Sequence, residues 1–410
     1  MKKLMNKTVI IPAIGFINWN GGIDYLKFQI KFLIELKKQN QVSRILLLLP
    51  VESFLGNFIR IIKNSIKFVL RMRLAKKTVF KYFLFIEDDE INKAVEFFDY
   101  YYDKNIGKKS LLYYVKQCND VIVFPTTKHL KNLSCKQIGY IPDLQHLHFP
   151  HFFPKYDKMA KNELFKKILS DCDAVIVNSQ DTKQDLQKNY PEESSKAKIF
   201  GYPFLPIADI SLFNNLVDIA KYNLPEKYFI ISSQFWIHKD HLTAFKALKI
   251  LHVKGYSKIH IVCTGSTNDH RFPNYFCDLK KSIKQLNLEE HIHFLGFIPK
   301  NEQIAIMKEA IASIQPTLFE GGPGGGATYD AVSYGIRAII SDIKINTEIV
   351  DESVHFFEKQ NPHSLSEMME SAINTFYESP TIDMLLARRE RNVQSGTNFL
   401  SNMFDDVVNT

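Results

Sequence analysis

Residues 316–335 read PTLFEGGPGGGATYDAVSYG, with five glycines between positions 321 and 326. The apolar residues 312–315 before this stretch are typical of a strand, and a helical pattern begins near Thr328. Glycines in such a turn let a ligand approach the backbone closely, and the N–H groups at a helix start favour negative charge. The spacing differs from GxGxxG and from a Walker A loop, because no Lys-Ser or Lys-Thr pair follows the glycines. We therefore expect a phosphate or diphosphate ligand; a flexible surface loop is the alternative.

Short β-branched runs alternate with helical patterns over most of the 410 residues, which is typical of parallel sheets built from βαβ units. A first series of strands is expected at 8–11, 44–49, 83–86, 121–124, 137–141 and 174–178. A second series is expected at 228–232, 258–263, 291–295, 312–315 and 337–341. Helices are expected at 23–38, 242–253, 278–285 and 303–310.

The segment 201–228 has three prolines and no clear period, which predicts a domain boundary. We expect an α/β chain with one domain at 1–202 and another at 203–385. A terminal helix is expected at 386–410, and it could pack back on the first domain.

The net charge of +8 is divided unequally. Residues 1–200 carry 33 Lys and Arg against 20 Asp and Glu, whereas residues 201–410 carry 19 against 24. This asymmetry predicts an anionic partner for the first half. A nucleic acid would also attract positive charge, but the acidic second half offers no support for that class, so we expect no nucleic acid partner.

From Asn57 to Phe83 the chain carries eight Lys and Arg and no acidic residue, with apolar residues near helical spacing. A basic amphipathic helix suits an anionic membrane surface, where each basic residue contributes about 1 kcal/mol. An ordinary helix packed on the core, with its basic face in solvent, is the alternative.

The five cysteines are scattered without a CxxC pair, which fits a reducing compartment. The N-terminal apolar run is interrupted by Pro12 and lacks a small-residue cleavage site, which favours a buried strand over a signal peptide. No segment reaches the roughly 18 uncharged apolar residues that a membrane span needs. We expect a cytoplasmic protein, or one bound to the inner face of the cell membrane.

The glycine stretch resembles the donor site of retaining glycosyltransferases of family 4. These have the GT-B fold, in which two Rossmann-like domains face each other across a donor cleft. The family motif is a Glu, seven intervening residues and a second Glu, followed by a short helix that ends in Gly. Here Glu320 matches the first acid and Asp330 the second, with nine intervening residues and Asp in place of Glu.

The resemblance implies a role for each part of this stretch. Glu320 would contact hydroxyls of the donor sugar, and Asp330 would bind the ribose, because a carboxylate accepts hydrogen bonds from hydroxyl groups. The backbone would hold the diphosphate at Gly324, Gly325, Gly326, Ala327 and Thr328.

A second match follows the strand expected at 228–232. In this loop the family has an Arg and, five positions on, a Lys, and both bind the donor phosphates. Lys239 matches the Lys, but Gln234 occupies the Arg position, so His238 or loop amides would have to compensate. A solvated surface Lys is the alternative. Gly265 and Phe297 follow the next two strands, where the family has the turn before the nucleotide and the loop that contacts the base.

The first half matches more weakly. Gly21 and Gly22 resemble the glycine-rich acceptor-side loop of the family, and a plain helix entry is the alternative. Relatives have a His-Asp pair at the end of the strand expected at 137–141, with the His beside the reacting sugar. Asp143 matches the Asp, but Pro142 occupies the His position, so we expect His146 to take a similar place.

Three neighbouring histidines, His146, His148 and His151, raise the question of a metal site. They lack the acidic ligand pattern of a structural metal centre, so we expect no metal. Histidines packed within a loop are the alternative.

The resemblance implies an enzyme that moves a sugar from a nucleotide diphosphate sugar to a hydroxyl of a saccharide or lipid-linked acceptor. The family implies a hexosyltransferase, with mannose among the candidate sugars, in surface polysaccharide or lipopolysaccharide assembly and without a cofactor. Stabilising the diphosphate leaving group would be the main catalytic task, and domain closure would exclude water. The implied catalytic residues are Glu320, Lys239, His146 and Asp143. A GT-B epimerase or phosphorylase and a catalytically silent GT-B nucleotide-binding scaffold are the alternatives.

Overall fold

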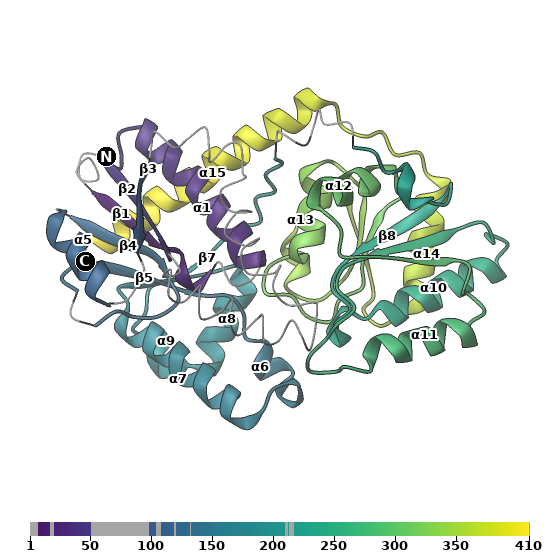
Figure 1. Ribbon diagram of the computed structural model, residues 1–410, viewed down its shortest axis with the longest axis horizontal. Coiled ribbons are helices and arrows are strands. Elements are labelled where there is room, and N and C mark those ends of the chain that lie inside the picture. Colours follow the sequence, from purple (N-terminus) through teal and green to yellow (C-terminus); the bar gives the residue numbers. More distant parts are fainter. Residues whose placement is uncertain are drawn as a thin grey trace, which may run out of the picture.

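The computed structural model describes residues 7–16, 20–50, 98–103, 108–118, 120–131, 133–209, 212 and 217–409. These residues form two parallel sheets flanked by helices, and the two parts lie side by side (Figure 1). The strand expected at 83–86 and the basic stretch from Asn57 to Phe83 lie outside the described residues. Within the described ranges, no helix combines the length and the apolar character that a membrane span requires.

The first sheet has the strand order β3-β2-β1-β4-β5-β6-β7. Its strands are β1 Thr8–Pro12, β2 Arg44–Pro50, β3 Phe98–Asp103, β4 Val121–Thr126, β5 Lys136–Ile141, β6 Ala174–Val177 and β7 Ile199–Gly201. Its helices are α1 Asn20–Lys38, α5 Lys108–Gln117, α6 Gln145–His148, α7 Lys155–Asp171, α8 Gln180–Asn189 and α9 Pro191–Ser194.

Helices cover both faces of this sheet, which explains its continuous apolar strands. Successive side chains of β1 point to opposite faces. Val9 and Ile11 pack with α1, whereas Ile10 packs with Val115 of α5 on the other face. All three β1 residues are fully buried.

The second sheet has the order β10-β9-β8-β11-β12-β13. Its strands are β8 Tyr228–Ser232, β9 His260–Thr264, β10 Ile292–Gly296, β11 Ser313–Gln315, β12 Ala338–Ser341 and β13 Val354–Phe357. Its helices are α10 His241–Val253, α11 Tyr275–Gln285, α12 Lys300–Glu309, α13 Gly325–Ser333 and α14 Pro362–Asn374. In both sheets the strand order reverses beside the first strand, between β1 and β4 and between β8 and β11. Ligands of open α/β sheets bind at the carboxyl ends of strands at such reversals.

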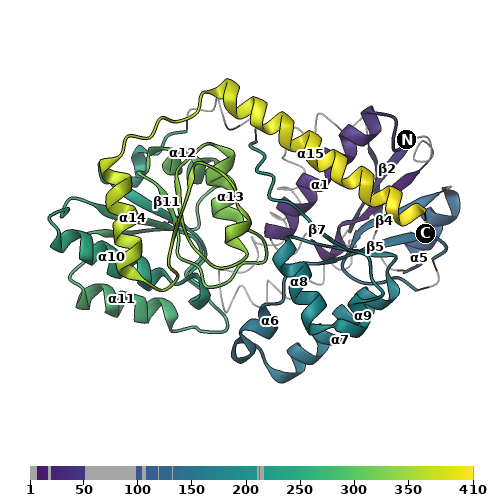
Figure 2. The same ribbon diagram turned by 180° about the vertical axis from the view of Figure 1, so that it is seen from behind.

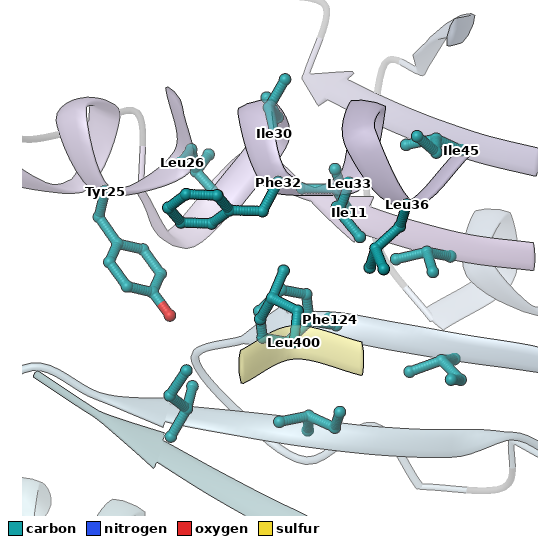
Figure 3. Packing of buried hydrophobic residues seen from close by; sticks show 14 of the residues in the cluster. Ile11, Tyr25, Leu26, Ile30, Phe32, Leu33, Leu36, Ile45, Phe124 and Leu400 are labelled. Atoms are coloured by element: carbon teal, nitrogen blue, oxygen red, sulfur yellow. The ribbon is translucent and has the colours of Figure 1, made fainter. Parts of the chain in front are cut away.

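The last helix, α15 Ile382–Val408, starts beside the second sheet and ends against the first (Figure 2). Leu400 of α15 is fully buried in the core that α1 and the first sheet form (Figure 3). Phe404 of the same helix is fully buried in this core as well. Gly396 allows the close approach of α15, because an added Cβ would lie 2.3 Å from the ring of Phe32. At its other end, Arg388 donates a hydrogen bond to the carbonyl of Val332 in α13. The helix therefore joins the two parts of the chain; the predicted boundaries at 202/203 and 385/386 stay predictions.

Candidate functional site

A cavity of about 420 Å³ lies between the domain that contains the first sheet and the domain that contains the second, and residues of both domains line it. The loops that follow β8 and β11 supply much of the wall on the second-domain side, as expected for a strand-order reversal. The predicted site residues that line the cavity are Gly21, Asp143, His238, Lys239, Glu320, Gly325, Gly326 and Asp330.

An ion pair joins the two loops at the cavity wall. Lys239 ends the 3-10 turn η6 Ile237–Lys239, and its Nζ lies 2.5 Å from Oε1 of Glu320. The two side chains are only 13% and 8% exposed, respectively. Gln315, the last residue of β11, also donates from Nε2 to Oε1 of Glu320 at 2.8 Å. The fold thus brings the ammonium of Lys239 beside the carboxylate of Glu320, although the two residues are 81 positions apart in the sequence. The ammonium can bind a phosphate, and the carboxylate can bind sugar hydroxyls.

The glycine loop gives the start of α13 its geometry. Gly324 precedes the helix at φ +68° and donates its N–H to Oδ1 of Asn346 at 2.8 Å. Gly325 has φ +62°, and an added Cβ would lie 2.5 Å from Oε2 of Glu320. At Gly326 no described heavy atom lies within 4 Å of an added Cβ. Since the first N–H groups of a helix have no intrahelical partner, the start of α13 is suited to an anion in the cavity.

The remaining glycine-loop residues are placed differently. Ala327 and Thr328 are 6% and 1% exposed and, like Gly324, are not among the described residues lining the cavity. Their predicted part in binding a diphosphate is therefore limited to the backbone. Gly321 and Gly322 line the cavity and also face the first domain, where added Cβ atoms would lie 3.0 Å from the carbonyl oxygen of Pro142 and 3.2 Å from Cβ of Asn178, respectively. These two glycines allow the domains to approach each other.

Asp330 lines the cavity from the first turns of α13, and it forms an ion pair with Lys300. Burial raises the pKa of Asp330 above its ordinary value, and the positive charge of Lys300 opposes that rise. Lys300 is the first residue of α12 and lines the cavity too. Sequence reasoning missed this residue, although it closes the loop in which we expected a contact with the base. Phe297 of that loop is 71% exposed and is not among the described residues lining the cavity.

The loop after β8 departs from the predicted phosphate site in two respects. His238 lines the cavity, but burial lowers its pKa to about 2, and the charges of Lys239 and Arg271 act in the same direction. A neutral imidazole cannot replace the missing Arg as a cation, which corrects one expectation. Gln234 and Gly265 lie outside the described cavity wall. Gly265, at φ +128°, supports the backbone of that loop, because an added Cβ would lie 2.2 Å from the carbonyl oxygen of Ser233.

The first domain contributes Asp143 but not His146. Asp143 Oδ1 accepts the backbone N–H of Gln145 at 2.9 Å, which starts the short helix α6. This turn directs His146 into its own domain, where Nε2 lies 2.8 Å from Oδ1 of Asn162 and the side chain is 1% exposed. Burial lowers the pKa of His146. The structure therefore does not bring His146 to the cavity, contrary to expectation.

Other first-domain residues at the cavity include some that the sequence did not point out. Gly21 lines the cavity, whereas Gly22 is not among the described lining residues. Asn178, at the end of β6, donates from its amide to the carbonyl of Pro142 at 3.1 Å. Among the described residues, no group of three or more His, Cys, Asp or Glu side chains is arranged to hold a metal ion.

An aromatic wall forms another part of the cavity. It consists of Phe28 from α1, Tyr329 from α13, and Phe204, which lies after β7. The ring centroids of Phe28 and Phe204 lie 5.0 and 4.9 Å from that of Tyr329. Phe204 lies in the segment that the sequence marked only as a domain boundary. The cavity is thus lined both by charged side chains, including the Lys239–Glu320 and Lys300–Asp330 pairs, and by aromatic rings.

Residues 215–380 match the family model of Glycosyl transferases group 1. The O-antigen chain mannosyltransferase RfbU of Salmonella typhimurium is 25% identical over 227 residues, which cover 55% of this chain. That match spans 57% of the length of RfbU, so it leaves a large part of that protein unmatched.

Two of the similar solved structures illustrate a likeness that extends over nearly the whole chain. Anabaena HepE, crystallised with UDP and glucose, has a TM-score of 0.56 at 12% identity, covering 98% of this chain and 96% of HepE. A UDP-forming α,α-trehalose-phosphate synthase from Burkholderia xenovorans has a TM-score of 0.60 at 13% identity, with coverages of 98% and 99%. At such identities the likeness shows the fold, and it confirms the predicted arrangement of two Rossmann-like domains. Assignment to family 4 stays a prediction. The segment 215–380 therefore matches the glycosyl transferases group 1, and the chain as a whole has the GT-B fold.

Proposed function

We propose that the protein transfers a hexose, with mannose as the first candidate, from a nucleotide diphosphate sugar to a hydroxyl of a saccharide or lipid-linked acceptor. We propose further that the anomeric configuration is retained and that the product enters a surface polysaccharide or lipopolysaccharide. One observation carries this proposal: the Lys239–Glu320 pair and the start of α13 meet in one cavity between the domains. The names of RfbU and of the HepE complex with UDP and glucose support it.

The geometry suggests how the residues divide the work. The ammonium of Lys239 and the N–H groups at the start of α13 would stabilise the charge that develops on the leaving diphosphate. Glu320 would accept hydrogen bonds from donor hydroxyls while Lys239 and Gln315 hold its carboxylate in place. Asp330 would have to bind the ribose while paired with Lys300 or after exchanging that partner. Asp143 is a first-domain carboxylate that lines the same cavity, as Asp24 of α1 also does.

The test begins with binding and then measures transfer. A thermal-shift screen of UDP, GDP and ADP identifies the nucleotide, because a ligand of the native state raises its stability. The corresponding nucleotide sugars are then offered with saccharide and lipid-linked acceptors, and the anomeric configuration of the product is determined by NMR. Nucleotide binding without any transfer would indicate a silent scaffold. An isomerised donor would indicate an epimerase, and release of a sugar phosphate by inorganic phosphate would indicate a phosphorylase.

We also propose that transfer requires no metal ion and takes place in the cytoplasm or at the inner face of the membrane. All five cysteines are free thiols, as a reducing compartment allows. Activity that survives an excess of EDTA would support the first point. The second is tested by sedimentation with anionic vesicles, from which neutralising Arg60, Lys63, Lys67, Arg71 and Arg73 together should release the protein.

A further inference from the structure

A loop of the second domain contacts a helix of the first. Glu348 ends the 3-10 turn η7 Asn346–Glu348, which follows β12. Its carboxylate accepts the backbone N–H of Gln180 at 3.0 Å and that of Asp181 at 2.6 Å. These are the first two residues of α8, on the side of the first domain next to the second (Figures 1 and 2). A carboxylate at a helix start is stabilised by both hydrogen bonds and the helix dipole.

A lysine of the same loop adds two contacts. Lys344 Nζ lies 2.6 Å from Oδ1 of Asp181 and donates to Oε1 of Gln184 at 2.9 Å. The lysine side chain is 68% exposed, so salt will screen this pair and its contribution will be small. Glu348 is therefore the stronger of the two connections between the 344–348 loop and α8.

The 344–348 loop also fixes the start of α13. Asn346 is fully buried, and its Oδ1 accepts the N–H of Gly324 at 2.8 Å. Its Nδ2 donates to the carbonyl of Ser341 at 2.9 Å, which fixes the amide from both ends. Only one residue, Thr347, separates Asn346 from Glu348 in the chain. A displacement of Glu348 is therefore transmitted to the glycine loop over a short distance, through the buried side chain of Asn346.

In the first domain, one short segment contacts two loops of the second domain. Asn178 lies against Gly322, and Gln180 and Asp181 bind Glu348. Ser179 between them caps α8 by accepting the N–H of Thr182 at 2.9 Å. Residues 178–181 thus contact the glycine loop at one end and the 344–348 loop at the other.

We propose that Glu348 is a positioning residue that holds the two domains together and couples their closure to the geometry of the glycine loop. Its effect on sugar transfer rests on the function proposed above, whereas its effect on closure does not. Without Glu348 the start of α8 loses its carboxylate partner, and the domains separate more readily. Water then enters the cavity more often, so donor hydrolysis rises relative to transfer.

The experiment compares Glu348→Lys, which places a positive charge at the start of α8, with the milder Glu348→Gln. The matched control is Glu289→Lys, a charge reversal at an exposed position of the same domain. Thermal unfolding establishes that each variant is folded. Small-angle X-ray scattering of the full chain, with and without UDP, then reports domain closure independently of activity.

We expect Glu348→Lys to have a larger radius of gyration than the wild type, Glu348→Gln to lie between them, and Glu289→Lys to match the wild type. In kinetics, Glu348→Lys should lower kcat/KM by about tenfold, within the range typical of coupled sites, and raise the ratio of hydrolysis to transfer. If Glu348→Lys is folded but matches the wild type in scattering, the proposal is wrong. If the wild type transfers no sugar at all, the proposed function fails, and scattering alone still decides the role of Glu348.

Discussion

The strand ends of both domains face the same cavity, but the domains differ in whether their predicted catalytic residues reach it. In the second domain, Lys239 and Glu320 follow β8 and β11, and both reach the cavity wall. In the first domain, Asp143 reaches the cavity, whereas His146, three residues on, is buried against Asn162. The loops after β8 and β11 bring Lys239 and Glu320 to the cavity, whereas Gly265 and Phe297, after β9 and β10, are not among its described lining residues. In the first domain, the direction of one side chain in the short helix α6 keeps His146 away from the cavity.

The largest expected effect tests the second-domain half of this comparison. Lys239→Ala and Glu320→Ala should each lower kcat/KM for transfer by about 10²- to 10³-fold, because each removes a charged group at the developing diphosphate or at the donor sugar. Both variants should remain folded, as judged by circular dichroism. Lys246→Ala, at an exposed position of α10, is the control. Turnover like that of the wild type in either variant contradicts the proposed site.

The next effect separates two adjacent glycines. Gly325→Ala should both destabilise the chain and impair transfer, because φ is +62° and the new Cβ would displace the carboxylate of Glu320. Gly326→Ala has room for its Cβ, so it should unfold at the wild-type temperature and lose only nucleotide affinity. Unfolding temperature and UDP affinity, measured for both variants, separate the two roles. Equal losses of stability would show that the loop acts as one strained unit.

A third prediction concerns pH and the buried histidines of the second domain. Burial lowers the pKa of His238 to about 2 and that of His241 to about 3. The unfolded chain takes up protons near pH 6.5 and the folded chain does not, so stability falls as the pH drops below 6.5. Each histidine contributes up to about 1.4 kcal/mol per pH unit between 6.5 and its folded pKa.

Unfolding free energies at pH 7.5 and 5.0 measure this slope. In His241→Gln the loss between the two pH values should be smaller than in the wild type, even if the absolute stability is lower. A slope unchanged by the substitution would mean that His241 can be protonated in the folded chain. Exposed His363 on α14, replaced in the same way, serves as the control.

The smallest expected effect tests the first-domain half. His146→Gln should leave kcat and KM for transfer within about twofold, because the side chain faces Asn162 rather than the cavity, and should cost about 1 kcal/mol of stability. Steady-state kinetics and thermal unfolding of this one variant test both statements. Loss of transfer in a fully folded His146→Gln would restore His146 to the reacting centre and remove the contrast between the domains.

Much of the fold could be predicted because parallel sheets require local, repeated patterns. Every predicted strand within the described residues is present, with ends within two residues of the prediction. The predicted helices 23–38, 278–285 and 303–310 each start three residues earlier, at Asn20, Tyr275 and Lys300. The first turn of a helix carries little apolar periodicity, so its start is hard to locate. The three strands that the sequence did not predict, β3, β7 and β13, all lie at sheet edges, where a strand pairs on one side only and need not be apolar throughout.

The candidate site, like the fold, has features that the sequence predicts and features that only the structure reveals. The sequence by itself determined the glycine loop, its position between strand and helix, and the acids at 320 and 330, because these depend on residues adjacent in the chain. Only the tertiary structure decided that Lys239 pairs with Glu320, that Lys300 pairs with Asp330, and that Glu348 binds the start of α8. Each of these contacts joins residues far apart in sequence, so it depends on how the elements pack and on which way each side chain then points.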